Sequence, residues 1–243
     1  MHGRVVAIIP ARYHATRLPG KPLAMIAGHP MIEHVYRRAS AARLVSAVLV
    51  ATDDPRIADA VDAFGGTAVM TSADHPSGTD RLAEVAAHLH CDVVVNVQGD
   101  EPLLDPASVD AAIAACLDDS SIAISTLRTP LADADRDNPN VVKVVINLKG
   151  DALYFTRSLV PYLRAGQAPV RSWRHLGLYV YQRATLLALA RLQPTPLEQA
   201  EGLEQLRALE HGVSIRTVAT ATTAPSVDTP DDLAAVRQLL SRA

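Results

Sequence analysis

Short apolar runs alternate with longer amphipathic segments through the first half of the chain. The runs at 5–9, 47–51 and 92–97 are almost continuously apolar, which is typical of strands buried on both faces. The segments between these runs place apolar residues at helical spacing. The pattern predicts helices at 30–42, 55–64, 79–90 and 106–117, and shorter strands at 67–71 and 122–127.

This regular alternation predicts an α/β fold with a mainly parallel sheet and helices on both of its faces. Ligands of such sheets bind beyond the carboxyl ends of the strands. We therefore expect a binding site in the loops that follow Ile9, Thr71 and Val97.

The second half of the chain has a different pattern. Two strand-like segments, 141–147 and 152–155, flank residues 148–151, which have the composition of a hairpin turn. Residues 175–181 alternate like another strand, and a last helix is expected at 230–240. These features predict a mixed sheet with a substrate-binding role.

Composition excludes several classes of protein. Of the 243 residues, 49% are hydrophobic, and the formal net charge is −3, so there is no overall basic field to recruit nucleic acid. No apolar run reaches the roughly 18 residues that span a bilayer, and the N-terminus lacks signal-peptide features, so we expect a cytoplasmic protein without membrane contact. The two cysteines, Cys91 and Cys116, match no zinc or redox motif.

The first apolar run leads into a basic loop between Pro10 and Pro22. Arg12, Arg17 and Lys21 place three cations there, and Arg and Lys are the side chains that bind phosphate oxygens. The loop is neither a Walker motif nor a glycine-rich dinucleotide motif. A solvated basic loop is the alternative, but the position after a buried strand favours binding of a nucleoside triphosphate.

A carboxylate follows the strand at 92–97, at the same predicted sheet edge. Asp100 is our first candidate for a Mg²⁺ ligand, because Mg²⁺ takes one or two protein carboxylates beside a triphosphate. A turn or helix-cap role is the alternative for Asp100. For Asp228, the residues alone favour a helix-entry role, since Pro230 and the last predicted helix follow it closely.

Ordered motifs along nearly the whole chain resemble those of the 3-deoxy-manno-octulosonate (KDO) cytidylyltransferases, although Ser72 stands where some members carry Arg. The resemblance implies transfer of CMP from CTP to the anomeric hydroxyl of KDO for lipopolysaccharide biosynthesis, a Mg²⁺ cofactor and a homodimer. The motifs that carry it lie at 8–13, 16–23, 70–71, 74–81, 95–102, 138–143, 154–157, 175–179, 196–198, 203–207 and 227–230.

The resemblance also implies roles for individual residues and a nucleotidyltransferase-type fold. Catalysis would rest on Arg12, Lys21 and Asp100, and the metal on Asp100 and Asp228. The nucleotide-binding residues would be Arg12, Arg17, Lys21, Ser77, Gly78 and Thr79. The sugar-binding residues would be Gln98, Arg157, His175, Tyr179, Glu204 and Gln205, with Arg157 and His175 facing the negative charge of the sugar.

Several of these residues have an ordinary alternative. Ser77 or Thr79 could cap the helix at 79–90, His175 could be a strand-end histidine, and Glu204 and Gln205 could face solvent. Because no linker or repeat interrupts the chain, we expect one domain over 1–243. Its nucleotide-binding half would span 1–135, and its sugar-binding and dimerisation half 136–243.

Three rival functions remain open from the sequence. A cytidylyltransferase for another acidic sugar, such as a sialic acid, is the nearest, and the motifs at 175–177 and 203–207 favour KDO over it. A non-catalytic nucleotide-binding regulator is a second, which the presence of both Asp100 and Asp228 disfavours. A dehydrogenase is disfavoured because its glycine motif is missing.

Overall fold

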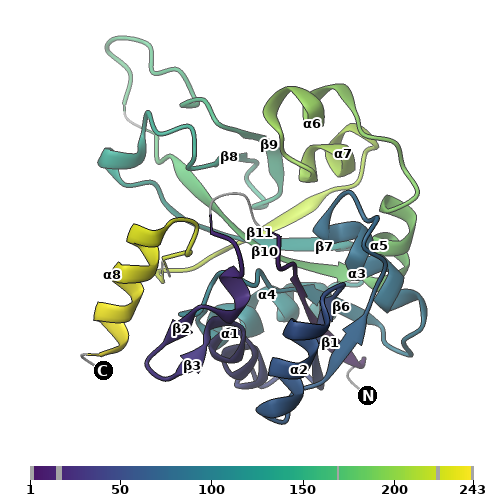
Figure 1. Ribbon diagram of the computed structural model, residues 1–243. Coiled ribbons are helices and arrows are strands. Elements are labelled where there is room, and N and C mark those ends of the chain that lie inside the picture. The colour runs from purple at the N-terminus through teal and green to yellow at the C-terminus, as the bar shows by residue number, and fades with distance from the viewer. Residues whose placement is uncertain (1–2, 15–17, 169, 223–224, 242–243) are drawn as a thin grey trace. The chain divides into compact units, whose positions relative to one another are not determined.

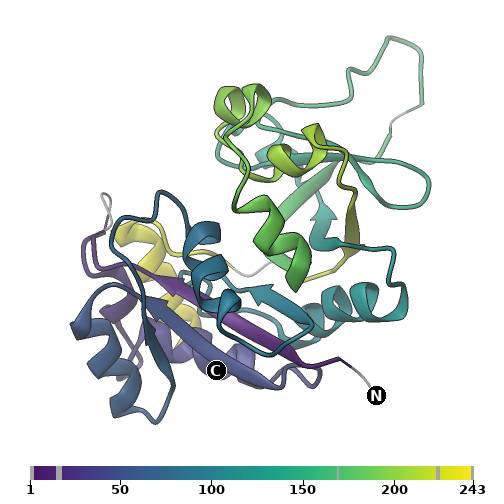
Figure 2. The same cartoon turned by 90° about the vertical axis from the view of Figure 1, so that its right-hand side faces the viewer.

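A computed structural model describes residues 3–14, 18–168, 170–222 and 225–241 of the chain. The chain divides into two compact units, each described separately below: the first comprises Met1–Asp110 with Ala224–Ala243, and the second Ala111–Thr223. Their elements can be followed in Figure 1 and, turned by 90°, in Figure 2. The single domain with halves at 1–135 and 136–243 stays a prediction.

Four parallel strands form the sheet of the first unit. They are β1 (Val5–Ala11), β4 (Ala47–Thr52), β5 (Ala68–Met70) and β6 (Val93–Asn96), in the order β6-β1-β4-β5. Residues 5–9 of β1 are all buried, as their continuous apolar pattern predicts. The parallel sheet of the prediction is thereby confirmed.

Helices cover both faces of this sheet. The steps from β1 to β4 and from β4 to β5 run in one direction, so right-handed crossovers place α1 (Met31–Ser40) and α2 (Pro55–Ala63) on the same face. There the rings of Tyr36 and Phe64 meet edge to face, 5.4 Å apart. Helix α3 (Gly78–Ala87) returns from β5 to β6 and so covers the opposite face.

The C-terminal segment completes the first unit. Helix α8 (Pro230–Leu240) has the bounds that the sequence predicts and packs against the β2 strand (Met25–Ile26). Its N-cap is Thr229, which forms a capping box with Asp232. Strand β2 pairs with β3 (His29–Pro30), and the short helix η1 (Lys21–Leu23) precedes them.

The sheet of the second unit is mixed, as predicted. Strand β10 (Trp173–Gln182) runs antiparallel to β7 (Ile124–Pro130) and to β8 (Lys143–Ile146). Strand β9 (Ala152–Thr156) forms the predicted hairpin with β8, while β11 (Ile215–Ala219) runs parallel to β7.

The residues between β8 and β9 account for the conformation of the turn. The side-chain carbonyl of Asn147 accepts hydrogen bonds from the backbone N–H groups of Lys149 and Asp151, at 2.9 Å each. Gly150 takes a φ of +86°, a left-handed conformation that costs other residues free energy. The residues at 148–151 therefore make the turn that their composition predicts.

The remaining helices have fewer sequence signals. Helix α4 (Pro106–Asp118) matches the prediction and contains the boundary between the units. Helices α5 (Arg183–Leu189), α6 (Pro196–Glu201) and α7 (Gln205–Glu210) and the short η2 (Asp133–Asp135) were not predicted. Among the described residues, no helix is both long enough and apolar enough to cross a membrane.

Candidate active site

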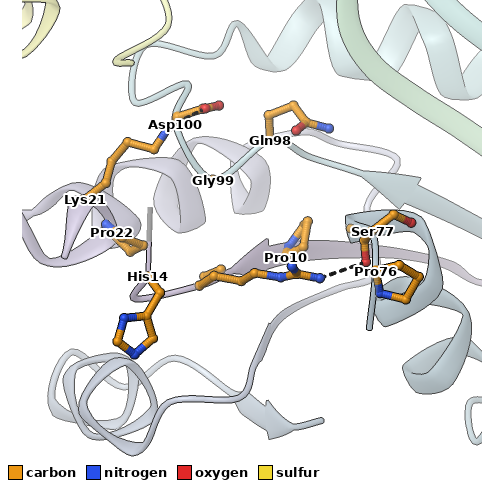
Figure 3. Close-up of a pocket in the computed structure, with 12 residues that line it drawn as sticks. Pro10, His14, Lys21, Pro22, Pro76, Ser77, Gln98, Gly99 and Asp100 are labelled. Carbon is orange, nitrogen blue, oxygen red and sulfur yellow. Dashed lines mark hydrogen bonds and ion pairs between the residues drawn. The ribbon is translucent and has the colours of Figure 1, made fainter. Parts of the chain in front are cut away.

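A pocket of about 330 Å³ lies in the first unit, beyond the carboxyl ends of its strands (Figure 3). Its lining comes from the three loops that the strand pattern singled out: the loops after β1, β5 and β6. The lining residues are Pro10, Ala11, Arg12, His14, Lys21, Pro22, Pro76, Ser77, Gly78, Gln98, Gly99 and Asp100.

Gly99 lets two of these loops approach each other. A β-carbon at position 99 would lie 3.0 Å from the backbone oxygen of Pro10, which is closer than side chains normally sit to a backbone atom. The lack of a side chain at residue 99 therefore favours the close passage of the loop after β6 against the end of β1. This contact brings Asp100 to the basic loop.

The two ends of the basic loop are tied together. The N–H of Gly20, which has a φ of +69°, donates to the Tyr13 oxygen at 2.9 Å. The Tyr13 ring also lies against Gly20, and the guanidinium of Arg56 stacks 3.3 Å from the centroid of that ring. Arg56 is in turn paired with Asp54 at the start of α2. Arg17 lies outside the described residues.

Lys21 is the centre of the charged groups of the pocket. Its Nζ lies 2.7 Å from Asp100 Oδ2 and 3.2 Å from Asp228 Oδ1, although these carboxylates are 79 and 207 positions away in the sequence. A backbone hydrogen bond also joins these segments, because the N–H of Val227 donates to the backbone oxygen of Asp100 at 2.8 Å. The predicted phosphate-binding lysine and both predicted metal ligands therefore meet at one point.

Asp228 lies at the entry of α8, where its N–H donates to Asp232 Oδ2 at 3.0 Å, but it is not the N-cap. Thr229 is the N-cap of α8, and its side-chain oxygen accepts from the N–H of Asp232 at 3.2 Å. The Asp228 carboxylate instead faces Lys21. The helix therefore fixes the backbone beside Asp228 and leaves its carboxylate directed to the charged cluster.

Two carboxylates that converge on an ammonium group form a suitable place for a divalent cation. Within the described ranges, no group of three or more His, Cys, Asp or Glu side chains could hold a metal by itself. Asp100 and Asp228 do fit Mg²⁺, which binds proteins through one or two carboxylates and completes its octahedron with water and substrate phosphates. The Lys21 ammonium marks where positive charge is stabilised between them.

Arg12 points toward the loop after β5. One of its terminal nitrogens donates to the backbone oxygens of His75, at 2.5 Å, and Ser77, at 3.2 Å. Ser77 also caps α3 through a hydrogen bond from the N–H of Asp80, so the capping alternative for Ser77 is confirmed. Thr79 lies in the first turn of α3.

Arg157, on the second unit, binds backbone carbonyls. Its guanidinium donates to the oxygens of Glu201 at 2.8 Å, Pro139 at 2.9 Å and Gly202 at 3.4 Å. It therefore ties together three stretches of chain. Lys143, a residue without a predicted role, has a buried side chain and donates to the backbone oxygens of Asn138 at 2.6 Å and Arg157 at 2.9 Å. Burial lowers the pKa of Lys143.

His175 and Tyr179, on β10, are neutral groups. The centroid of the His175 ring lies 4.9 Å from that of the Phe155 ring and 5.3 Å from that of the Tyr179 ring. Its Nε2 is 2.9 Å from Thr126 Oγ1. Burial, and secondly the nearby Arg174, lower the pKa of His175 to about 3. His175 is therefore an uncharged hydrogen-bonding group near neutral pH, and its contact with the sugar stays a prediction. Burial also raises the pKa of Tyr179 well above its ordinary value.

The remaining predicted sugar-binding residues lie on both units. Gln98 lines the pocket of the first unit, and its Nε2 donates to Asn96 Oδ1 at 3.3 Å. Glu204 is exposed at the start of α7, and Gln205 is the first residue of that helix.

Comparisons with known proteins identify the class to which this fold and pocket belong. A family model described as cytidylyltransferase matches residues 6–215, so the chain is a nucleotidyltransferase of that class. Two relatives, from Geobacter metallireducens and Myxococcus xanthus, are each 54% identical over 98% of this chain and at least 96% of their own length, and each is named 3-deoxy-manno-octulosonate cytidylyltransferase. The chain belongs to the 3-deoxy-manno-octulosonate cytidylyltransferase family, which confirms the resemblance in its sequence.

Solved structures agree with this assignment. A CMP:2-keto-3-deoxy-manno-octonic acid synthetase complexed with CTP matches 98% of this chain and 99% of its own, with a TM-score of 0.95 and 47% identity. A cytidylyltransferase from Leptospira borgpetersenii shares the fold, with a TM-score of 0.68 at 17% identity.

Proposed function

We propose that this chain transfers CMP from CTP to the anomeric hydroxyl of KDO, giving CMP-KDO and pyrophosphate for lipopolysaccharide biosynthesis. The observation that carries the proposal is the contact of Lys21 with Asp100 and Asp228 at the pocket formed by the three sheet-edge loops. The names of the relatives and the CTP in the similar solved structure support it.

The reaction is an in-line displacement at phosphorus. The anomeric oxygen of KDO forms a bond to the α-phosphorus of CTP, and the bond from that phosphorus to the bridging oxygen breaks. Pyrophosphate leaves with the electron pair, and the hydroxyl proton is released to the surroundings. Because no covalent enzyme intermediate is needed, catalysis consists of positioning and stabilisation of charge.

Arg12 and Lys21 would hold the phosphates. Lys21 would exchange its carboxylate partners for phosphate oxygens, which a flexible ammonium group can do without a fixed geometry. Arg12, held by the carbonyls of His75 and Ser77, presents a planar guanidinium suited to a phosphate group. Gly78 lines the pocket beside Ser77, and Thr79 follows it in α3.

Asp100 and Asp228 would hold Mg²⁺. When bound, Mg²⁺ supplies charge neutralisation for the triphosphate and fixes the orientation of its oxygens. The two carboxylates keep their place through the backbone bond between Val227 and Asp100 and through the capped start of α8.

We propose that the acidic sugar is recognised mainly by hydrogen bonds. Gln98, Glu204 and Gln205 supply donors and acceptors for hydroxyl groups, and neutral His175 and Tyr179 each supply a polar hydrogen. Arg157 is the permanent cation among the six predicted residues, and it would balance the sugar carboxylate.

The decisive experiment measures pyrophosphate release with Mg²⁺ and a panel of substrates. We expect release with CTP and KDO, and little with UTP or with a sialic acid in place of KDO. Release with the sialic acid but not with KDO would replace the proposed sugar, and binding of CTP without any release would favour the regulator. The homodimer is a further proposal from the family resemblance, and sedimentation of the purified chain tests it. The cytoplasmic location is a proposal from the sequence pattern.

A further inference from the structure

The loop at 72–77 forms one wall of the nucleotide pocket through Pro76 and Ser77. It also holds Arg12, because the backbone oxygens of His75 and Ser77 accept hydrogen bonds from one terminal nitrogen of that guanidinium. The orientation of Arg12 therefore depends on where this loop places its carbonyl groups.

A single carboxylate oxygen on α3 anchors the other side of the loop. Oε2 of Glu84 accepts a hydrogen bond from the N–H of Ser72 at 3.1 Å and also contacts Nε2 of His75. The hydrogen bond from His75 holds the pKa of Glu84 below its ordinary value, so the acceptor is a carboxylate at neutral pH. His75 is thereby held twice, by its ring to α3 and by its oxygen to Arg12.

The base of the loop has separate anchors. The N–H of Thr71 donates to the Thr52 oxygen at 2.9 Å, and the side chain of Thr71 contacts the buried guanidinium of Arg81. Nη2 of Arg81 also lies 3.1 Å from Oδ2 of Asp53. These contacts fix the chain up to residue 71 independently of Glu84. Loss of Glu84 should therefore release mainly the loop at 72–77.

We propose that Glu84 is a positioning residue of the nucleotide site, which holds His75 and thus the guanidinium of Arg12 in place for the triphosphate. This inference rests on the proposed function, since it assigns the pocket to CTP. Glu84 acts through the loop and reaches no substrate itself. Its effect should therefore appear in CTP affinity and disappear when Arg12 is absent.

Because Ser72 and His75 both contact the same oxygen of Glu84, Oε2, conservative variants of Glu84 are informative. In Glu84→Gln, the amide oxygen can replace Oε2 and accept from both Ser72 and His75, so CTP affinity should stay within about twofold of the parent. Glu84→Asp is one methylene too short, and Glu84→Ala has no acceptor. Loss of a charge-assisted hydrogen bond of this kind should weaken CTP binding about tenfold in both.

The test measures the Kd for CTP by titration calorimetry, and KM for each substrate by pyrophosphate release, with Asp59→Ala, at an exposed position of α2, as the control. We expect the KM for KDO to stay unchanged. If Glu84→Ala does not fold, His75→Ala removes the ring anchor without altering α3, and it should weaken CTP binding similarly. Unchanged CTP affinity in the Asp and Ala variants, or Glu84→Gln as weak as Glu84→Ala, would overturn the proposal.

A double-variant cycle separates positioning from a general loss of structure. In an Arg12→Ala background, Glu84→Ala should cost no further CTP affinity, because the group that it positions is gone. Additive losses in the cycle would contradict the proposal. Calorimetry does not require turnover, so a chain that binds CTP with this pattern and releases no pyrophosphate would refute the proposed reaction while supporting the role of Glu84.

Discussion

Lys21 in the first unit and two cations of the second unit, Arg157 and Lys143, meet different kinds of partner. In the first unit, Lys21 contacts two carboxylates, at 2.7 and 3.2 Å, in an open pocket. In the second unit, Arg157 and the buried Lys143 donate to backbone oxygens. A side-chain ion pair can exchange partners when a charged ligand arrives, whereas a cation bonded to several carbonyls fixes the chain around it. The comparison indicates exchange of charge at Lys21 and rigid hydrogen bonding at Arg157 and Lys143.

The largest expected effect tests the exchange of charge. Asp100→Asn keeps the shape of the side chain but removes one of the two negative charges that meet Lys21. We expect the rate of pyrophosphate release to fall by about 10² to 10³ at saturating Mg²⁺. The reason is that Mg²⁺ would lose one of its two proposed carboxylate ligands, so that the negative charge of the phosphates would be neutralised less well. Far-ultraviolet circular dichroism should be unchanged, with Asp59→Asn as the matched surface control. A rate near that of the parent protein would contradict the metal-binding role.

A somewhat smaller effect is expected for Lys21 itself. Lys21→Ala should lower kcat about 10- to 100-fold, because the phosphates lose a charge-assisted contact, while the KM for KDO stays nearly constant. Steady-state kinetics with each substrate varied in turn gives both values. If the variant raised only the KM for KDO, the basic loop would bind the sugar. The proposal that Lys21 exchanges its carboxylates for phosphate oxygens would then be wrong.

The predictability of the site depends on how each residue is placed. Lys21 and Asp100 could be found from the sequence, because each follows a continuous apolar run and parallel strands end at a common edge. Asp228 could be assigned only from the family resemblance, since its contact with Lys21 spans 207 positions. The bonds of Arg157 and Lys143 end on backbone oxygens, which every residue has, so the sequence carries no trace of them.

The fold was predictable to a similar extent and for a similar reason. The buried strands of the first unit have continuous apolar patterns, and α8 is marked by Pro230 at its start. Helices α5, α6 and α7 have only six or seven residues each, too few for a helical period to be recognised.

The second unit offers a test of rigidity. Lys143→Met keeps most of the buried side-chain volume but removes the Lys143 hydrogen bonds to the backbone oxygens of Asn138 and Arg157, of which the Asn138 oxygen keeps the N–H of Val141 as a donor. We expect the free energy of unfolding to fall by about 1 to 3 kcal/mol, measured in urea, and the KM for KDO to rise while that for CTP is unchanged. Lys149→Met, on the exposed hairpin turn, is the control. Equal increases in both KM values would show that Lys143 does not act on the sugar side alone.

The smallest effect concerns the pH dependence of stability. Because the pKa of His175 is lowered from 6.5 to about 3 in the folded protein, the unfolded chain binds one more proton than the folded chain between those values. The contribution of His175 to stability is therefore complete above pH 6.5 and is lost as the pH falls toward 3. The slope due to this one group is at most about 1.4 kcal/mol per pH unit. Urea unfolding of the parent protein and of His175→Gln between pH 5 and 7.5 measures it. The variant should show the shallower dependence, and equal slopes would mean that folding leaves the pKa of His175 at its ordinary value.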